Sequence, residues 1–521
     1  MFSFVQHPSL AMDGLKGSVI GYEQTINSNT DILNYNDLIQ LSTTQPKQGS
    51  TLYQKLDKQL HTPIIQQPPT QENNFLHGNI LGDFFRVASW NIERGFNIDL
   101  IEKVFLYPDN MIFNWKSIPK EYQDEIEILS KAKIVFLNET DIGLPRTKYE
   151  NIAKRLADGL MTGYVFGTEF VEVDPYQLGI KRFTNNERAY LEERVLEQLD
   201  NINKERFLGL HGNAILSKYP ILNARIIRLP ECYNWYKEES NKLSTLELTR
   251  RETAEKIFSS RVLTELRHGN RIAVLADILL PNKQTITAVA VHLENRCKPE
   301  CRVKQFEFLL NRLRDIKNPV IIGGDLNTTG ADASPVSIKK EIFKKVKDPE
   351  FIAKQALLSL TPFTAVQNLV LNTANAIRQF KDPTIKNIPV ILPNKERKIF
   401  DLVQEFRFND SRAFDVRGIP EKTHNGNYAL FSNSNERELK GFKSTFELER
   451  HLGVAKYKLD WFFVKPLKLK HSNDKKGAYA YAPHFGRTLK LVNRVFGERI
   501  SDHDPITVDI PVHELITKSR I

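Results

Sequence analysis

The stretch "PVIIGGDLN", residues 319–327, decides how this sequence folds. An apolar run rich in β-branched residues is typical of a buried strand, and the glycine pair marks the point where that strand ends. Asp325 and Asn327 follow at once. The stretch therefore predicts a buried strand that delivers a carboxylate and an amide to one edge of a sheet.

Strands and helices alternate along the rest of the chain. Apolar runs of strand length are separated by amphipathic segments of helix length, and this alternation predicts an α/β architecture. We predict strands at 84–92, 133–139, 285–293 and 319–325 and helices at 119–132, 148–160 and 302–316.

Three parts are expected along the chain. Residues 1–83 are rich in Gln, Asn, Ser, Thr and Pro, which predicts a polar, flexible N-terminal arm. Residues 84–515 are expected to form one catalytic domain. Within it, residues 331–443 carry helical spacing of apolar residues with basic residues between them, and predict a helical insertion.

Composition indicates a folded protein, and its net charge is compatible with anionic partners. Hydrophobic residues make up 41% and charged residues 26% of the 521, as in globular proteins. The formal net charge of +10 favours partners such as nucleic acid or phospholipid headgroups, although solubility alone also accounts for such a charge. No run of eighteen apolar residues and no signal peptide is seen, so a cytoplasmic location without a transmembrane segment is expected.

The three cysteines are Cys232, Cys297 and Cys301. They cannot build a disulfide framework, and no oxidising compartment is implied. The last two lie four residues apart, which fits a local bridge or half of a metal site, but no further ligand follows at the required spacing. Incidental thiols are the favoured interpretation.

Several predicted strands end in a polar side chain. Taken singly, each such residue is most simply a turn or capping residue. Taken together, they converge on one rim if the strand ends lie side by side. Carboxylates and amides are hard oxygen ligands, so the set predicts Mg²⁺ or Mn²⁺ rather than structural zinc. Its members are Asn91, Glu93, Glu139, Asn213, His292, Asp325, Asn327, Asp460, Asp502 and His503.

The order of these segments resembles that of a known family. The motifs "WNIERG", "LNE", "GNAILS", "HLEN", "GDLN", "LDWFFV" and "SDHDPI" are similar to those of the endonuclease/exonuclease/phosphatase superfamily, in its DNase and sphingomyelinase-type branch. The resemblance implies a DNase I-like fold, a four-layer α/β sandwich of two packed mixed β-sheets flanked by helices. It does not cover the N-terminal arm or the helical insertion.

The resemblance also implies a metal site and a base. Glu139 is expected to be the principal metal ligand, with Asn91 and Asp502 completing the shell of a Mg²⁺ or Mn²⁺ ion. His503, oriented by Asp460, is expected to take a proton from the attacking water.

The remaining roles concern the phosphate. Asp325 and Asn327 are expected to orient the nucleophile and the phosphate, and His292 and Asn213 to donate to phosphate oxygens. Arg487 ends a basic, aromatic loop suited to a nucleic-acid backbone.

Three functions are compatible with these residues. The favoured one is a metal-dependent phosphodiesterase that acts as a nuclease. A lipid phosphodiesterase of the sphingomyelinase kind predicts an exposed apolar loop, and none is evident. A binding or scaffold protein on this fold predicts eroded ligand positions, whereas the expected residues are intact. Asn138, which stands where many family members have Gln, is a small departure.

Overall fold

The computed structural model describes most of the chain from Ile32 to Val512. The described residues are 32–70, 72–78, 81–106, 118–182, 201–240, 265–328, 383–384, 395–418, 430–438, 441–447, 456–466 and 486–512.

The larger sheet has nine strands. Strands β3 and β4 run parallel at its centre, and the other pairs are antiparallel. The order is β1 (Ile64–Gln66), β5 (Gly163–Glu172), β6 (Leu210–Ser217), β4 (Ile134–Ile142), β3 (Gly82–Arg94), β18 (Ile506–Pro511) and β17 (Gly486–Thr488), with β2 (Leu76–Gly78) beside β3 and β8 (Arg267–Gly269) beside β5.

The second sheet has five strands, and it too is mixed. Strands β10 and β11 are parallel, while their outer neighbours run antiparallel. The order is β16 (Asp460–Lys465), β11 (Val320–Asp325), β10 (Thr285–His292), β9 (Ile272–Leu279) and β7 (Ile221–Arg228). Two short pairs, β12 (Arg437–Glu438) with β13 (Gly441–Phe442) and β14 (Phe446–Glu447) with β15 (Lys456–Tyr457), complete the described strands.

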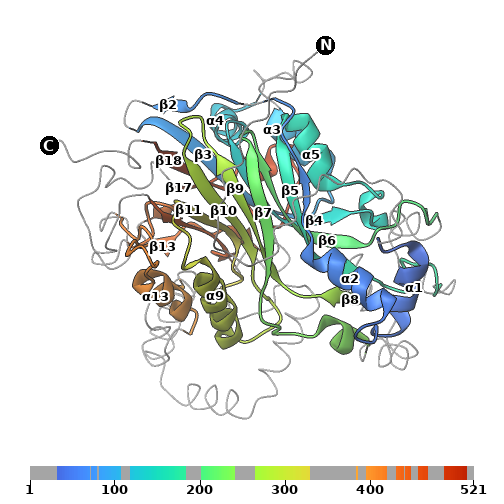
Figure 1. The fold of residues 1–521 in the computed structure, drawn as a ribbon. Coiled ribbons are helices and arrows are strands. Elements are labelled where there is room, and N and C mark those ends of the chain that lie inside the picture. The colour runs from blue at the N-terminus through green and yellow to red at the C-terminus, as the bar shows by residue number, and fades with distance from the viewer. Residues whose placement is uncertain are drawn as a thin grey trace, which may run out of the picture.

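The two sheets pack face to face between helices (Figure 1). Alternate residues of each strand face the other sheet and form an apolar layer, as Phe136 on β4 and Phe462 on β16 do. The opposite face of the larger sheet packs on α3 (Ile98–Leu106), α4 (Lys120–Ser130) and α5 (Ile152–Leu160), and that of the smaller sheet packs on α9 (Pro299–Leu313) and α13 (Arg397–Glu405). The expected four-layer α/β sandwich of two mixed sheets is confirmed.

The N-terminal part differs from the expected arm. Residues from Ile32 onward are described, and they include α1 (Tyr35–Thr43) and α2 (Thr51–His61). Leu38 and Leu41 on α1, and Leu56 and Leu60 on α2, are buried against the larger sheet. A few leucines at helical spacing in a polar background are therefore enough to dock this segment. The division of the chain into domains stays a prediction.

Short strands cover one edge of β5. Strand β6 pairs along most of one side of β5. On the other side β1 pairs with residues 164–166 and β8 with residues 170–172. The backbone groups of β5 are thus hydrogen-bonded on both sides over most of its length.

Most of the predicted helical insertion, residues 331–443, lies outside the described residues. Within its described part, α13 buries Ile399, Phe400 and Val403. Phe400 packs edge-on against Trp461 of β16, with ring centroids 4.6 Å apart. This helix therefore belongs to the outer layer of the smaller sheet.

The glycine pair at the end of β11 allows the sheets to approach closely. A Cβ on Gly323 would lie 2.6 Å from both Phe136 and Phe462. Gly324 has φ +141°, and a Cβ there would lie 1.9 Å from the Val291 carbonyl oxygen and 3.0 Å from Asn138 Oδ1. Only glycine fits at this position without moving β10 or Asn138.

We expect Gly324→Ala to lower the free energy of unfolding by about 2 to 5 kcal/mol, because backbone strain at positive φ adds to a steric clash. Gly497→Ala is the matched control: its φ is +87°, but nothing lies within 4 Å of the added Cβ. Gly497→Ala should lower the free energy of unfolding only by the cost of backbone strain, about 1 to 2 kcal/mol. Denaturant unfolding of both variants measures the difference, and equal losses would contradict the close approach.

Candidate active site

Strand register brings the predicted polar strand ends together. In the smaller sheet His292 on β10 is paired with Asp325 on β11, and Asp325 with Asp460 on β16. In the larger sheet Asn91 on β3 is paired with Asn138 on β4, directly before Glu139. Side chains at this end of one sheet contact side chains of the other sheet, so the polar ends of the two sheets lie opposite each other.

Asp325 is the centre of this cluster. Asn91 Nδ2 donates to Asp325 Oδ2 at 3.2 Å. The same oxygen lies 3.7 Å from Nε2 of His292 and 3.7 Å from Nε2 of His503. Asp325 is 1% exposed, and burial raises the pKa of its carboxyl although the nearby His503 opposes the rise. One buried carboxylate thus lies between two histidines from different segments.

His503 and Asp460 form a buried pair. His503 Nδ1 lies 2.8 Å from Asp460 Oδ2. Burial alone would lower the pKa of His503, but Asp460 and Asp325 hold it well above its usual value. Burial likewise opposes ionisation of Asp460, and the histidine outweighs this and lowers the pKa of the carboxyl. The loop that carries His503 is held from behind, where Trp90 Nε1 donates to the His503 carbonyl oxygen at 2.8 Å.

The backbone is irregular where the site residues emerge. Glu93, Glu139 and Asn327 have φ between +48° and +53°, a region that residues other than glycine rarely occupy. The register of β3 with β4 shifts after Asn91, and that of β4 with β6 shifts after Leu137. Bulges of this kind redirect side chains at the ends of strands, and such strain is concentrated at functional sites.

Glu139 offers the chemistry of a divalent-cation ligand. Burial raises the pKa of its carboxyl, but the surrounding His292 and Arg94 outweigh burial and lower the pKa to about 2. Asn91 Nδ2 donates to Glu139 Oε1 at 3.3 Å, and Glu93 Oε2 accepts a hydrogen bond from the Asp502 backbone N–H at 3.2 Å. A carboxylate whose pKa is lowered to about 2, with the further carboxylates of Glu93 and Asp502 on adjoining segments, is the kind of hard oxygen ligand that Mg²⁺ or Mn²⁺ prefers. In the present orientation Asn91 supports Glu139 through its nitrogen, and it would have to turn Oδ1 forward to bind the ion itself.

Asn138 joins the two sheets behind the site. Its Nδ2 donates to Asn213 Oδ1 at 2.8 Å and to the Val291 carbonyl oxygen at 3.2 Å, and its Oδ1 accepts from the Asp325 backbone N–H at 3.0 Å. Asn213 is buried, and its Nδ2 has no hydrogen-bond partner among the described residues. One amide donor therefore remains available next to the site.

Asn327 lies at the site, where its backbone N–H donates to Asp325 Oδ1 at 2.8 Å, whereas Arg487 lies elsewhere. Asn327 Nδ2 donates to the Leu293 carbonyl oxygen at 3.0 Å, so that its amide nitrogen joins two loops of the site. Arg487 Nη1 donates to Asp509 Oδ2 at 3.2 Å, beside the buried Arg86. The structure thus does not bring Arg487 into the cluster. The aromatic residues of its loop, Tyr479, Tyr481 and Phe485, lie outside the described residues.

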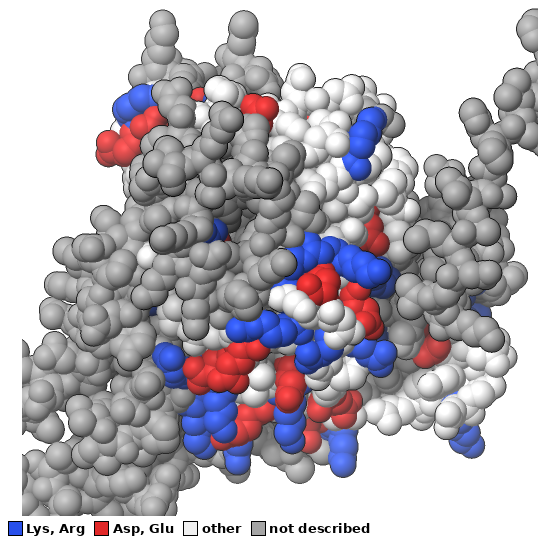
Figure 2. Space-filling model, turned by 60° about the vertical axis from the view of Figure 1, so that its left-hand side comes forward, with Lys and Arg blue, Asp and Glu red and all other residues white. Residues whose placement is uncertain are grey.

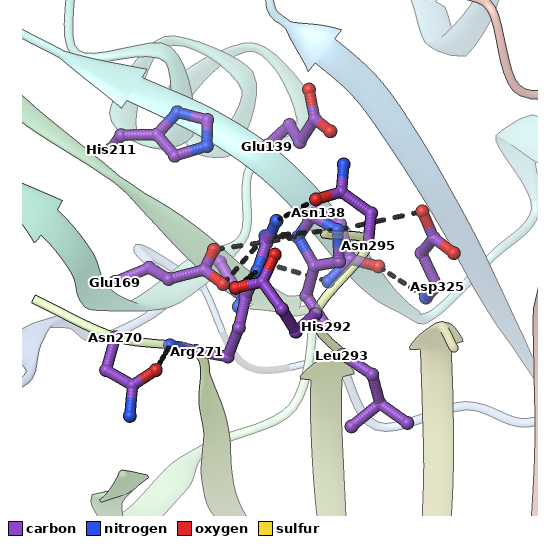
Figure 3. A network of polar contacts seen from close by, with 12 residues as sticks. Asn138, Glu139, Glu169, His211, Asn270, Arg271, His292, Leu293, Asn295 and Asp325 are labelled. Carbon is purple, nitrogen blue, oxygen red and sulfur yellow. Dashed lines mark hydrogen bonds and ion pairs between the residues drawn. The ribbon is translucent and has the colours of Figure 1, made fainter. Parts of the chain in front are cut away.

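A buried ionic network beside His292 was not anticipated from the sequence (Figure 3). Arg271 Nη1 donates to Glu169 Oε1 at 3.0 Å and lies 2.9 Å from His292 Nδ1. Arg271 Nε also donates to Glu294 Oε2 at 3.4 Å. Burial raises the pKa of Glu169, but Arg271 and then His292 outweigh it and lower the pKa to about 2. These groups fix the orientation of the His292 ring.

The sequence did carry a signal for these residues. Glu169 stands in the strand-like run "YVFGTEFVEV", and Arg271 opens the apolar run "RIAVLADIL". A charge inside or at the start of a buried strand is expensive unless it is paired, so both residues called for a partner. The identity of the partners could not be read from the sequence, because β5 and β9 lie in different sheets.

The cysteine prediction was wrong for two of the three residues. Cys232 and Cys301 form a disulfide, while Cys297 remains a free thiol. The paired cysteines are 69 residues apart in sequence, so tertiary packing rather than local spacing brings them together.

No protein-family model and no curated protein matches the chain. Solved structures do match. Among them are an endonuclease/exonuclease/phosphatase from Beutenbergia cavernae (13% identity over 82% of this chain and 71% of that chain, TM-score 0.32), the 3′-5′ exonuclease NExo from Neisseria meningitidis (12%, 82% and 99%, 0.36) and the human Nocturnin catalytic domain (11%, 86% and 96%, 0.33).

Structures of the family that the sequence motifs resemble are therefore among those similar to this chain. At these identities and TM-scores the likeness assigns neither a substrate nor a residue role. The reaction has to be inferred from the site's own geometry.

We expect Glu169→Gln to lower the free energy of unfolding at pH 7 by about 3 kcal/mol, the low end for breaking a buried ion pair, because Glu294 still faces Arg271. The folded pKa of about 2 lies below the ordinary value of 4.5, so this stability is present above pH 4.5 and is lost as the pH falls towards 2. Denaturant unfolding at pH 7, 4 and 3 should show that the difference in free energy of unfolding between variant and native protein becomes smaller as the pH falls.

The exposed Glu205 provides the control, and Glu205→Gln should leave stability within about 0.5 kcal/mol of the native value. A gap for Glu169→Gln that widens at low pH would contradict the assigned ion pair.

Proposed function

We propose that this protein is a divalent-metal-dependent phosphodiesterase, and that its substrate is nucleic acid. The observation that carries the proposal is the placement of Asp325 Oδ2 at 3.7 Å from Nε2 of both His292 and His503, with Asp460 behind His503 and Glu139 on the facing sheet. This arrangement supplies a base, a hydrogen-bond donor and an ionised metal ligand around one small volume.

His503 is the proposed general base. A carboxylate oxygen only accepts hydrogen bonds, so the ring nitrogen facing Asp460 carries a proton. Nε2 accepts a proton from water only in the neutral form of His503, and the raised pKa moves that form towards alkaline pH. Asp325 lies on the Nε2 side, where it would orient that water. Both carboxylates stabilise the imidazolium that forms when the proton arrives.

His292 is the proposed donor to a phosphate oxygen. A guanidinium only donates, and Arg271 Nη1 lies 2.9 Å from Nδ1 and 3.2 Å from Nε2 of His292. The proposed tautomer has the lone pair on Nδ1, the nearer nitrogen, and the proton on Nε2. That nitrogen points towards Asp325 and the centre of the cluster. Asn213, with its available Nδ2, and Asn327 are proposed to contribute further polar contacts to the phosphate.

Glu139, Asn91 and Asp502 are the proposed ligands of Mg²⁺ or Mn²⁺. When bound, such an ion neutralises the charge that develops on the phosphoryl oxygens. The chain's own contribution is to keep Glu139 ionised and to hold Asp502 through Glu93.

The charge of the chain supports a polyanionic substrate. The net charge is +10, and sequence-independent contacts to phosphates favour a basic protein. On the face that Figure 2 shows, Lys and Arg side chains alternate with Asp and Glu side chains instead of forming one continuous basic area. The proposal therefore rests on the chemistry of the site more than on its surface, and Arg487 is proposed only as a peripheral contact.

A lipid substrate has no comparable support. Among the described residues the exposed large hydrophobic side chains are Met161, Ile180 and Leu222, which stand on three separate segments. Within the same part of the chain, no helix combines the length and the hydropathy needed to span a bilayer. Location in the cytoplasm stays a prediction.

We expect the protein to hydrolyse DNA or RNA in the presence of Mg²⁺ and not in EDTA, and His503→Asn to reduce the rate by about 10²- to 10⁴-fold. The panel should contain plasmid DNA, single-stranded DNA, RNA, sphingomyelin, phosphoinositides and bis-p-nitrophenyl phosphate. His77→Asn is the matched control, since His77 also pairs with an aspartate but is exposed.

Each alternative gives a different result in this panel. Turnover of sphingomyelin without turnover of nucleic acid would replace the nuclease by a lipid phosphodiesterase. No turnover of any substrate would favour a binding or scaffold protein. A His503→Asn variant as active as native protein would remove His503 from the reaction.

We expect Glu139→Gln to weaken Mg²⁺ binding by at least about tenfold, because the amide lacks the negative charge that a hard cation prefers. Isothermal calorimetry of the metal alone measures this without substrate, with Glu205→Gln as the control. Unchanged Mg²⁺ affinity in Glu139→Gln would place the ion elsewhere.

A further inference from the structure

All three cysteines of the chain meet at one place outside the active site. Cys232 follows β7, Cys301 lies in the first turn of α9, and Cys297 precedes that helix. The three sulfur atoms all lie within 4.8 Å of one another, and each residue is partly exposed. A free thiol thus lies beside a disulfide in a partly exposed part of the described structure.

We propose that Cys232, Cys297 and Cys301 form a thiol–disulfide exchange site, in which Cys297 resolves mixed disulfides formed with small thiols. The inference goes beyond the phosphodiesterase proposal, and no step of it depends on that reaction. It rests on the positions of the three sulfur atoms.

The exchange needs no oxidant. The thiolate of a monothiol such as glutathione attacks one sulfur of the Cys232–Cys301 disulfide, forms a mixed disulfide and releases the other cysteine as a thiolate, which takes up a proton. The Cys297 thiol then loses its proton and attacks the protein sulfur of the mixed disulfide. A new disulfide to Cys297 forms, and the monothiol leaves as a thiolate and is reprotonated. The number of disulfides is unchanged.

Full reduction requires a dithiol. The first sulfur of the dithiol forms the mixed disulfide. The second sulfur then attacks the first, so that the oxidised dithiol leaves as a cyclic disulfide. The two cysteines gain the two electrons and two protons that the dithiol loses. Cys297 is then one of three thiols.

The charged groups around Cys297 set the rate of exchange. Burial raises the pKa of its thiol to about 11; Arg302, whose Nη1 lies 3.8 Å from the sulfur, opposes this, while Glu294 and Glu396 add to it. Cys297 is therefore protonated at neutral pH. The resolving step should accelerate about tenfold for each unit by which the pH rises, up to about pH 11, because only the thiolate attacks.

The cysteine cluster is connected to the wall of the active site through Glu294. Trp235, three residues after Cys232, donates from Nε1 to Glu294 Oε2 at 3.0 Å. Arg302, next to Cys301, donates to the Glu294 carbonyl oxygen at 3.2 Å. The Glu294 carboxylate in turn contacts Arg271, which orients His292. The disulfide thus ties together the two segments that hold Glu294.

The first test counts thiols in the full-length chain purified without reductant. Ellman's reagent in guanidinium chloride should detect one thiol per chain. Three thiols with a bound soft cation such as Zn²⁺, released by a chelator, would overturn the proposal in favour of a metal site, and three thiols without a cation would overturn it as well.

The second test follows the exchange itself. After incubation with reduced glutathione at pH 8 and acid quenching, non-reducing peptide mapping should find disulfides that contain Cys297 in native protein. The Cys297→Ser variant cannot form disulfides at position 297, so glutathione should instead accumulate as a mixed disulfide on Cys232 or Cys301. Native protein that keeps only the Cys232–Cys301 pair, or accumulates as much mixed disulfide as Cys297→Ser, would overturn the proposal. Cys297→Ala repeats the comparison should the serine variant fail to fold.

The third test measures the connection to Glu294. The Glu294 amide donates to Gln305 Oε1 and the Arg296 amide to Glu294 Oε1, both at 3.0 Å. On reduction with dithiothreitol, hydrogen exchange at these amides should accelerate about tenfold or more, while that of Val289 inside β10 stays constant. Unchanged exchange at Glu294 would overturn the connection to the active site, whatever substrate the protein acts on.

Discussion

The active site depends on one buried amide, that of Asn138, which joins the two sheets. Its nitrogen donates to Asn213 in the larger sheet and to the Val291 carbonyl oxygen in the smaller one, while its oxygen accepts from the Asp325 backbone N–H. The approach is possible because Gly324 has no Cβ. The contacts of Asn138 thus set both the spacing between the sheets and the position of the Asp325 carboxylate. A change in one would also change the other.

The two histidines of the site have neighbours of opposite charge. Asp460 Oδ2 lies 2.8 Å from Nδ1 of His503 and favours a proton there, whereas Arg271 Nη1 lies 2.9 Å from Nδ1 and 3.2 Å from Nε2 of His292. Both rings direct Nε2 towards Asp325. Identical side chains therefore face one carboxylate from different electrostatic surroundings. The buried Glu169 balances the charge of the guanidinium beside His292.

The sequence predicted the ends of the strands better than the contacts between them. Asp325, Asp460 and His292 were recognisable because each follows an apolar run, and strand register then brings them side by side. Asn138 was taken for a small departure, since its role depends on the distance between two sheets, which no local pattern encodes. Glu169 and Arg271 were missed for the same reason. The cysteine pair and the docked N-terminal helices likewise depend on tertiary packing of segments far apart in the sequence.

The short strands beside β5 cover what would otherwise be an open edge of the larger sheet. Without β1 and β8, one side of this ten-residue strand would present unpaired N–H and carbonyl groups to solvent. An open edge of that length is a template for pairing with a second chain. Two three-residue strands cover residues 164–166 and 170–172 of this edge. Because β1 lies in the N-terminal segment, a chain shortened to begin at Phe84 would leave residues 164–166 without their partner strand.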